Sequence, residues 1–118
     1  MTDDMKQSMS YNVNGRILAT DDRGFLVNLD EWDAEVAAVI AGQLGITLTD
    51  AHWPILHLLR DLYIRFDLAP ANRALVKVVK ERLGEQQGNS IYLMQLFGGH
   101  AARDAAKIAG LPKPPHCL

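Results

Sequence analysis

Residues 49–67, TDAHWPILHLLRDLYIRFD, form the most strongly patterned stretch of the sequence. Large apolar side chains recur there at three- and four-residue steps, which predicts an amphipathic helix ending near Asp67. They are Trp53, Leu56, Leu59, Tyr63 and Phe66. Thr49 or Asp50 can cap this helix, and Pro54 lies in its first turn. We expect it to be the central helix, with all five apolar side chains in the core.

The same periodicity predicts four more helices, each followed by a glycine. Glycine ends helices readily because it adopts the left-handed backbone conformation without steric cost. Pro70 suits the opening of the helix that follows the central one. The four helices and their stop signals are residues 33–44 before Gly45, 70–83 before Gly84, 90–97 before Gly98, with Asn89 or Ser90 as cap, and 100–109 before Gly110.

The N-terminal part of the domain is expected to be a β-hairpin. Residues 16–19 and 25–29 are short apolar segments, and the loop between them, TDDRG, has the composition of a hairpin turn. We therefore predict a mainly α fold: a small orthogonal bundle of about five helices with an N-terminal hairpin. Residues 12–110 would form this single domain, after a disordered, polar tail over residues 1–11.

Residues 111–118, LPKPPHCL, are expected to form a flexible C-terminal arm. Three prolines among residues 112–115 remove backbone donors and favour an extended conformation. The only cysteine of the sequence, Cys117, is second from the end of this arm. At roughly 3.1 Å per residue, the segment from Gly110 would carry the sulfur about 25 Å from the last helix, far enough to enter another protein's pocket.

Bulk properties exclude several classes of function. A formal charge of −2 gives no general attraction to phosphate, so direct nucleic-acid binding is not expected. No apolar run approaches the roughly 20 residues of a membrane span. A single cysteine and an N-terminus without signal-peptide features favour the cytoplasm. His57 and Asp61 share a helix face, but two ligands and no CxxC or HExxH pattern predict no metal site.

Cys117 is the strongest candidate for chemistry. An exposed thiolate can take the outer sulfur of a donor persulfide and deliver it onward, which requires no cofactor beyond a transient cysteine persulfide. Exposure alone leaves a terminal thiol without function equally possible. His116 adjoins the thiol, although adjacency in sequence does not bring two side chains together. The arm residues of this candidate site are Gly110, Pro112, Lys113, Pro114 and His116.

A basic stripe is predicted on the helix after Pro70. Arg73, Lys77 and Lys80 are spaced to share one face, where they would stabilise a thiolate or persulfide anion on a folded-back arm. The alternative is a solvated helix face, which we favour for the two lysines. From another class of function, the helices around Pro70 and Gly84 could form a helix-turn-helix regulator that presents this stripe to DNA; the negative net charge counts against it.

Residues 89–118, NSIYLMQLFGGHAARDAAKIAGLPKPPHCL, resemble the C-terminus of the TusE/DsrC/DsvC family of sulfur-trafficking proteins, in which KIAGLPKP leads to a penultimate cysteine. The similarity extends through GRILATDDRGFL, GITLTDAHWPILHLLRDLYIRF and LAPANRALVKVVKERLGEQQGNS. It implies a helical bundle with an N-terminal hairpin and a flexible C-terminal arm. It also implies a role for Arg73, which matches the arginine of the family's P-x-x-R pattern.

The resemblance also indicates a branch of the family. DsrC-type members work with dissimilatory sulfite reductase and carry a second cysteine eleven positions before the penultimate one, where this sequence has Ala106. Without that thiol the sequence resembles the TusE branch, which implies sulfur from a TusBCD-type complex and a tRNA-thiolating acceptor that makes wobble 2-thiouridine. Gly98-Gly99-His100-Ala101 and the final His-Cys-Leu depart from the family pattern. Two alternative functions therefore stay open. The protein could be a single-cysteine carrier in sulfur oxidation with a DsrEFH-type donor, or a carrier that serves a sulfite-reductase-type protein.

Overall fold

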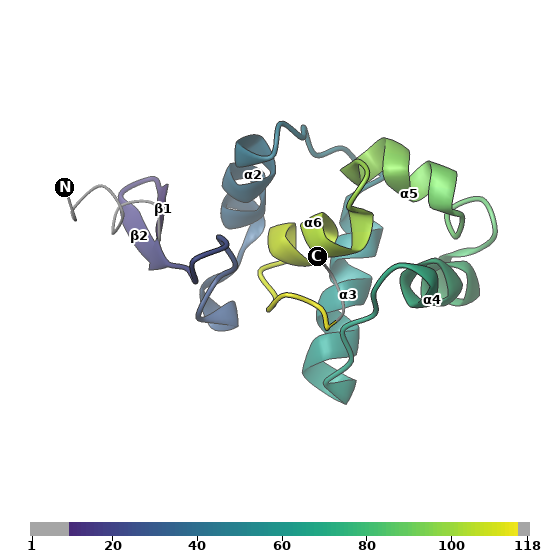
Figure 1. Ribbon diagram of the computed structural model, residues 1–118. Coiled ribbons are helices and arrows are strands. Elements are labelled where there is room, and N and C mark those ends of the chain that lie inside the picture. Colours follow the sequence, from purple (N-terminus) through teal and green to yellow (C-terminus); the bar gives the residue numbers. More distant parts are fainter. Residues whose placement is uncertain (1–9, 116–118) are drawn as a thin grey trace.

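Helix α3 (Trp53–Phe66) is the central helix of the computed structural model, which describes residues 10–115 (Figure 1). The fold is mainly helical with an N-terminal two-stranded hairpin, as predicted. The other elements, in chain order, are β1 (Ser10–Val13), β2 (Arg16–Ala19), the 3-10 helix η1 (Leu29–Glu31), α2 (Ala34–Gln43), α4 (Arg73–Leu83), α5 (Ser90–Phe97) and α6 (Ala101–Ile108).

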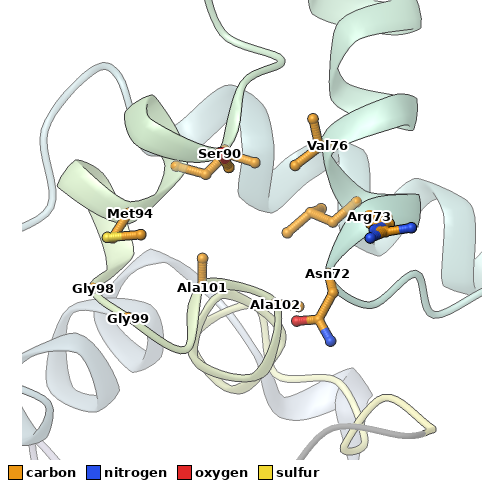
Figure 2. A pocket seen from close by; sticks show the side chains of 11 residues that line it. Asn72, Arg73, Val76, Ser90, Met94, Gly98, Gly99, Ala101 and Ala102 are labelled. Atoms are coloured by element: carbon orange, nitrogen blue, oxygen red, sulfur yellow. The ribbon is translucent and has the colours of Figure 1, made fainter.

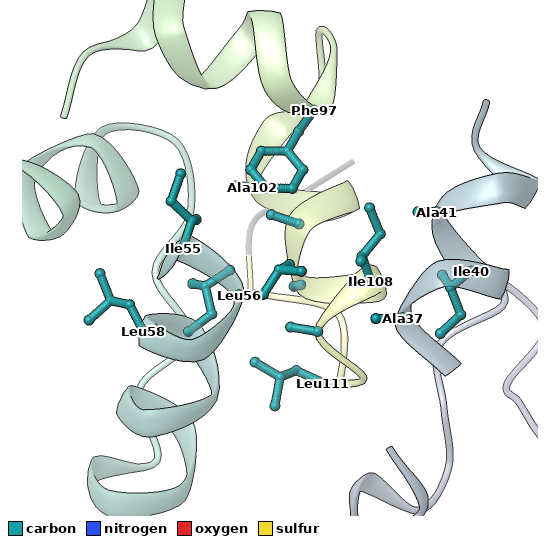
Figure 3. Packing of buried hydrophobic residues seen from close by; sticks show 14 of the residues in the cluster. Ala37, Ile40, Ala41, Ile55, Leu56, Leu58, Phe97, Ala102, Ile108 and Leu111 are labelled. Atoms are coloured by element: carbon teal, nitrogen blue, oxygen red, sulfur yellow. The ribbon is translucent and has the colours of Figure 1, made fainter. Parts of the chain in front are cut away.

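Helix α6 forms the middle of the core. It packs against α2, α3 and α5, and Figure 3 shows its side chains between those of α2 and α3. Ala105, Ala106 and Ile108 are buried there. The two alanines are small, so they let the neighbouring helices approach closely. Ile55 and Leu56 of α3 are fully buried in the same cluster. The last helix is therefore held on several sides, and this fixes the point from which the arm starts.

The helix boundaries follow the predicted signals with two exceptions. Asn89 caps α5, as predicted, and Asp33, predicted as the first residue of α2, caps that helix instead; each side chain accepts a backbone N–H of the first turn. Helix α3 instead has His52 at its cap position, and neither Thr49 nor Asp50 caps it. Helix α4 begins at Arg73 rather than at Pro70, because Asn72 has a positive φ of 47° that interrupts the helical backbone.

The hairpin lies one strand earlier than predicted. β1 pairs antiparallel with β2 across Asn14 and Gly15, whose φ angles of 51° and 89° suit a tight hairpin turn. Ser10 and Tyr11, both assigned to the polar tail, therefore belong to a strand. Of the predicted second strand, only a single bridge between Thr20 and Leu26 exists. Residues 1–9, also assigned to that tail, lie outside the described part of the chain.

The prediction that all five apolar side chains of α3 lie in the core is wrong for one of them. Leu56 and Leu59 are buried, and Trp53 and Tyr63 pack partly against the core. Phe66, however, has 56% of its surface exposed. Phe66 continues the apolar face of α3, but this end of the helix extends beyond the rest of the core.

Candidate functional site

The described part of the arm is held against the protein. Leu111 is 1% exposed and its N–H donates to the Ala106 carbonyl, while Pro114 is also buried. Pro112 is exposed and Lys113 is half-buried. The arm was expected to leave the fold after Gly110, but in the structure the chain stays on the surface through Pro114. A reach of about 25 Å measured from Gly110 would require these contacts to break.

Gly110 begins the arm in a conformation that few other residues can adopt. Its φ is +73°, and a β-carbon there would lie 2.5 Å from Cδ1 of Trp32. Trp32 Nε1 donates to the Ile108 carbonyl over 2.7 Å, so the tryptophan binds the end of α6 directly. The start of the arm is thus packed against a side chain from the loop before α2.

Arg60 completes this anchor, although it was not among the predicted site residues. Its guanidinium donates to the carbonyls of Ala109, over 2.8 Å, and Leu29, over 3.1 Å. The same group lies 4.3 Å from the ring centroid of Trp32, a cation–π distance. Burial lowers the pKa of Arg60 below its ordinary value, although Asp30 opposes that change. The only sign of this role in the sequence was that Arg60 stands at the border of the apolar face of its helix.

Arg73 lies where the described chain of the arm ends. A surface hollow of about 560 Å³ is lined by residues 68–74 and by Pro115. Arg73, the first residue of helix α4, is one of these lining residues and is exposed. No hydrogen bond or ion pair joins the Arg73 guanidinium to any residue between positions 10 and 115. The structure therefore brings the arm and a guanidinium without a partner among the described residues to one place.

A second cavity adjoins Arg73 on its other side. It has a volume of about 230 Å³ and lies between α4, α5 and the start of α6. Figure 2 shows Val76, Ser90 and Ala101 around it, one from each helix. Its lining is mostly apolar, and its polar side chains are Asn72 and Arg73 at the start of α4 and Ser90 of α5. Gly98 and Gly99, part of the loop that departs from the family pattern, form another part of its wall.

The two lysines of the predicted basic stripe do not line the hollow beside the arm. Lys77 is exposed and lines neither hollow, and Lys80 forms an ion pair with Glu85 at 4.0 Å. Cys117 and His116 lie outside the described residues. Within residues 10–115, no group of three His, Cys, Asp or Glu side chains could hold a metal ion. No helix in that range is long and apolar enough to cross a membrane.

The sequence from residue 12 to residue 118 matches the family model described as DsrC like protein. The chain belongs to this family. Sulfurtransferase TusE of Yersinia pseudotuberculosis is 47% identical over 104 residues, which cover 88% of this chain and 96% of that protein. TusE of Escherichia coli is 43% identical, over 88% of this chain and 95% of its own. The predicted family resemblance is confirmed.

Solved structures of the family share the fold. Allochromatium vinosum DsrC superposes with a TM-score of 0.84 at 43% identity, over 92% of this chain and 97% of that chain. The oxidised DsrC γ-subunit of Archaeoglobus fulgidus dissimilatory sulfite reductase superposes with a TM-score of 0.78 at 40% identity. The match covers 92% of this chain and 99% of that chain. These comparisons give no support to the helix-turn-helix regulator.

Proposed function

We propose that this protein is a sulfur carrier that accepts persulfide sulfur on Cys117 and passes it to an acceptor protein. The observation that carries the proposal is the agreement over 88% of the chain with relatives named sulfurtransferase TusE, in a sequence whose only cysteine is Cys117. The DsrC fold of the described residues agrees with it.

The chemistry is two successive thiol exchanges. The Cys117 thiolate attacks the outer sulfur of a donor persulfide; a new S–S bond forms on Cys117, the donor's S–S bond breaks, and the donor cysteine leaves as a thiolate. A nucleophile of the acceptor then attacks the outer sulfur on Cys117, which regenerates the thiolate. Each step moves one sulfur atom, and neither needs an external oxidant or reductant.

Arg73 is proposed to stabilise the sulfur anion. Cys117 follows Pro115 by two residues, so covalent geometry keeps their Cα atoms within about 7 Å of each other. Pro115 lines the same hollow as Arg73, and the guanidinium has no partner among the described residues. A nearby cation favours the charged form of a thiol or persulfide. Lys77, one turn further along α4, would add a smaller, solvent-screened contribution.

The proposed pathway is cytoplasmic tRNA thiolation, with a TusBCD-type donor complex, a tRNA-thiolating acceptor and no resident cofactor. The names of the TusE relatives favour it. Ala106 also favours it, since a sequence without a second cysteine cannot form the internal disulfide of the DsrC cycle. The second candidate is a carrier with a DsrEFH-type donor or a sulfite-reductase-type acceptor, which the likeness to a sulfite reductase γ-subunit favours.

Intact-protein mass spectrometry tests the carrier chemistry. The protein is incubated with a persulfide-loaded sulfurtransferase, and Cys117→Ser serves as the control. We expect a reducible gain of about 32 Da, one sulfur atom, in the wild type alone. No gain with several competent donors would refute the carrier. Measuring tRNA 2-thiouridine after deletion of the gene separates the two pathways, because only the first predicts its loss.

A further inference from the structure

The cavity between α4, α5 and the start of α6 has walls that suit a small apolar group. Leu75 and Leu93, each 1% exposed, and Ala102, 3% exposed, line it. Figure 2 shows Val76 of α4 and Ala101 of α6 facing the same space. Its volume is about 230 Å³, and one molecule of liquid water occupies about 30 Å³. The cavity can therefore hold roughly eight non-hydrogen atoms, the size of a small organic molecule.

Two of the three polar side chains of the lining stand together at one edge of the cavity. Asn72 and Arg73 both line it, and both are exposed. Figure 2 shows them on one side of the cavity, with their polar ends at its edge rather than inside it. Neither the Asn72 amide nor the Arg73 guanidinium forms a hydrogen bond or ion pair with a residue between positions 10 and 115. Among the described residues, the lining has one cation and no carboxylate.

A tight turn places these two residues at the edge. The Ala74 N–H donates to the Ala71 carbonyl over 3.0 Å, which closes a turn of residues 71–74. Asn72, the second residue of the turn, has φ 47° and ψ −111°, values typical of a type II′ turn, where glycine, asparagine and aspartate predominate. Arg73 then begins α4, and the N-terminal end of a helix carries a partial positive charge. This edge of the cavity therefore favours an anion.

We propose that the cavity binds a small monocarboxylate, with the carboxylate on Arg73 and Asn72 and an apolar tail of about five carbons between the helices. A guanidinium binds a carboxylate through two parallel N–H···O bonds, and the Asn72 amide can donate a third. An inorganic anion would leave the apolar walls without contacts, and an uncharged apolar molecule would leave Arg73 without a partner. Only an anion with an apolar tail satisfies both parts of the cavity.

This binding does not rest on the proposed function, but it would affect that function. Arg73 lines both the cavity and the hollow beside Pro115. A bound carboxylate would therefore compete with a sulfur anion for the same guanidinium.

Isothermal titration calorimetry with 4-methylpentanoate, a branched monocarboxylate that matches the cavity in size, tests the proposal. 4-Methylpentanamide keeps the shape of this ligand without the charge, and acetate keeps the charge without the tail. Arg73→Gln removes the cation, and Arg82→Gln, at an exposed arginine of the same helix that does not line the cavity, is the matched control. Ala101→Leu fills the cavity with a larger side chain. Nuclear magnetic resonance spectra of backbone amides show that each variant is folded and where the ligand binds.

We expect 4-methylpentanoate to bind with a Kd of about 1 mM, which is within the range for so small a ligand, and to shift the amide signals of Val76 and Ala101. 4-Methylpentanamide and acetate should bind about tenfold more weakly or less, because each lacks one of the two kinds of contact. Arg73→Gln should weaken binding of 4-methylpentanoate to the same extent, while Arg82→Gln leaves the Kd unchanged. Folded Ala101→Leu should not bind it.

Several results would overturn the proposal. They are the absence of saturable binding to the wild type at about 10 mM, a wild-type Kd in Arg73→Gln, and equal affinity for 4-methylpentanamide or acetate. If binding appears only after residues 116–118 are removed, the chain's own end occupies the cavity, and the proposal fails. The persulfide test of Cys117 uses a different readout, so each of these results leaves the carrier function intact.

Discussion

Gly110→Ala tests the packing that fixes the start of the arm. The added β-carbon would lie 2.5 Å from Cδ1 and 2.9 Å from Cγ of Trp32, distances at which the ring has to move. An alanine at the φ of +73° costs about 1–2 kcal/mol in backbone strain. Forcing a side chain into this packed contact costs about 1–3 kcal/mol more. The expected loss in free energy of unfolding is thus about 2–5 kcal/mol.

Gly45→Ala supplies the matched control. Gly45 has nearly the same φ, +75°, but a β-carbon added there would meet no heavy atom within 4 Å. Both substitutions change the unfolded chain in the same way, so their difference isolates the collision with Trp32. Urea denaturation at one temperature measures both free energies. If Gly110→Ala destabilises the protein no more than Gly45→Ala does, Trp32 does not hold the start of the arm as described.

Three other substitutions have defined outcomes. Arg73→Gln should raise the pKa of the Cys117 thiol and slow its alkylation at neutral pH, and an unchanged pH profile would contradict the anion role. His52→Ala, at a residue 4% exposed, leaves the Thr49 N–H and the Leu96 carbonyl unpaired and should cost about 2–4 kcal/mol in urea denaturation. Hydrogen bonding from the Val36 N–H lowers the pKa of Asp33, so its stabilisation is present above the ordinary value of 3.8 and is lost as pH falls through the lower folded value. Melting curves from about pH 2 to pH 6 should show a shallower acid limb for Asp33→Asn.

Local sequence signals predicted the elements well where the signal and its cause are close together. Asn89, one of the two predicted caps of α5, caps that helix because its side chain accepts a backbone N–H three residues later. The hairpin was predicted at the wrong place because residues 14–15 and residues 20–24 both have the composition of a hairpin turn. Asn14-Gly15 supplies two consecutive positive φ angles, which match the twist of paired strands, and the TDDRG loop does not.

The anchor of the arm could not be predicted, because it joins residues far apart in sequence. Arg60 contacts carbonyls 31 and 49 positions away, and Trp32 reaches one 76 positions away. Periodicity likewise cannot show where a core ends. Phe66 fits the helical repeat as well as Leu59 does, and only the arrangement of the other helices leaves it exposed.

The lack of a second cysteine makes an outside partner more important for this chain than for a carrier that can form an internal disulfide. Ala106 is buried in α6 and has no thiol, so a persulfide on Cys117 cannot be resolved within the chain. Its sulfur leaves only when an outside nucleophile reaches it. The anchor at Gly110 and the buried Pro114 hold the start of the arm against the fold, so either an acceptor comes to the protein surface or the contacts of Pro114 break. Selection among thiols then depends on which proteins can reach the arm, rather than on the reactivity of the thiol alone.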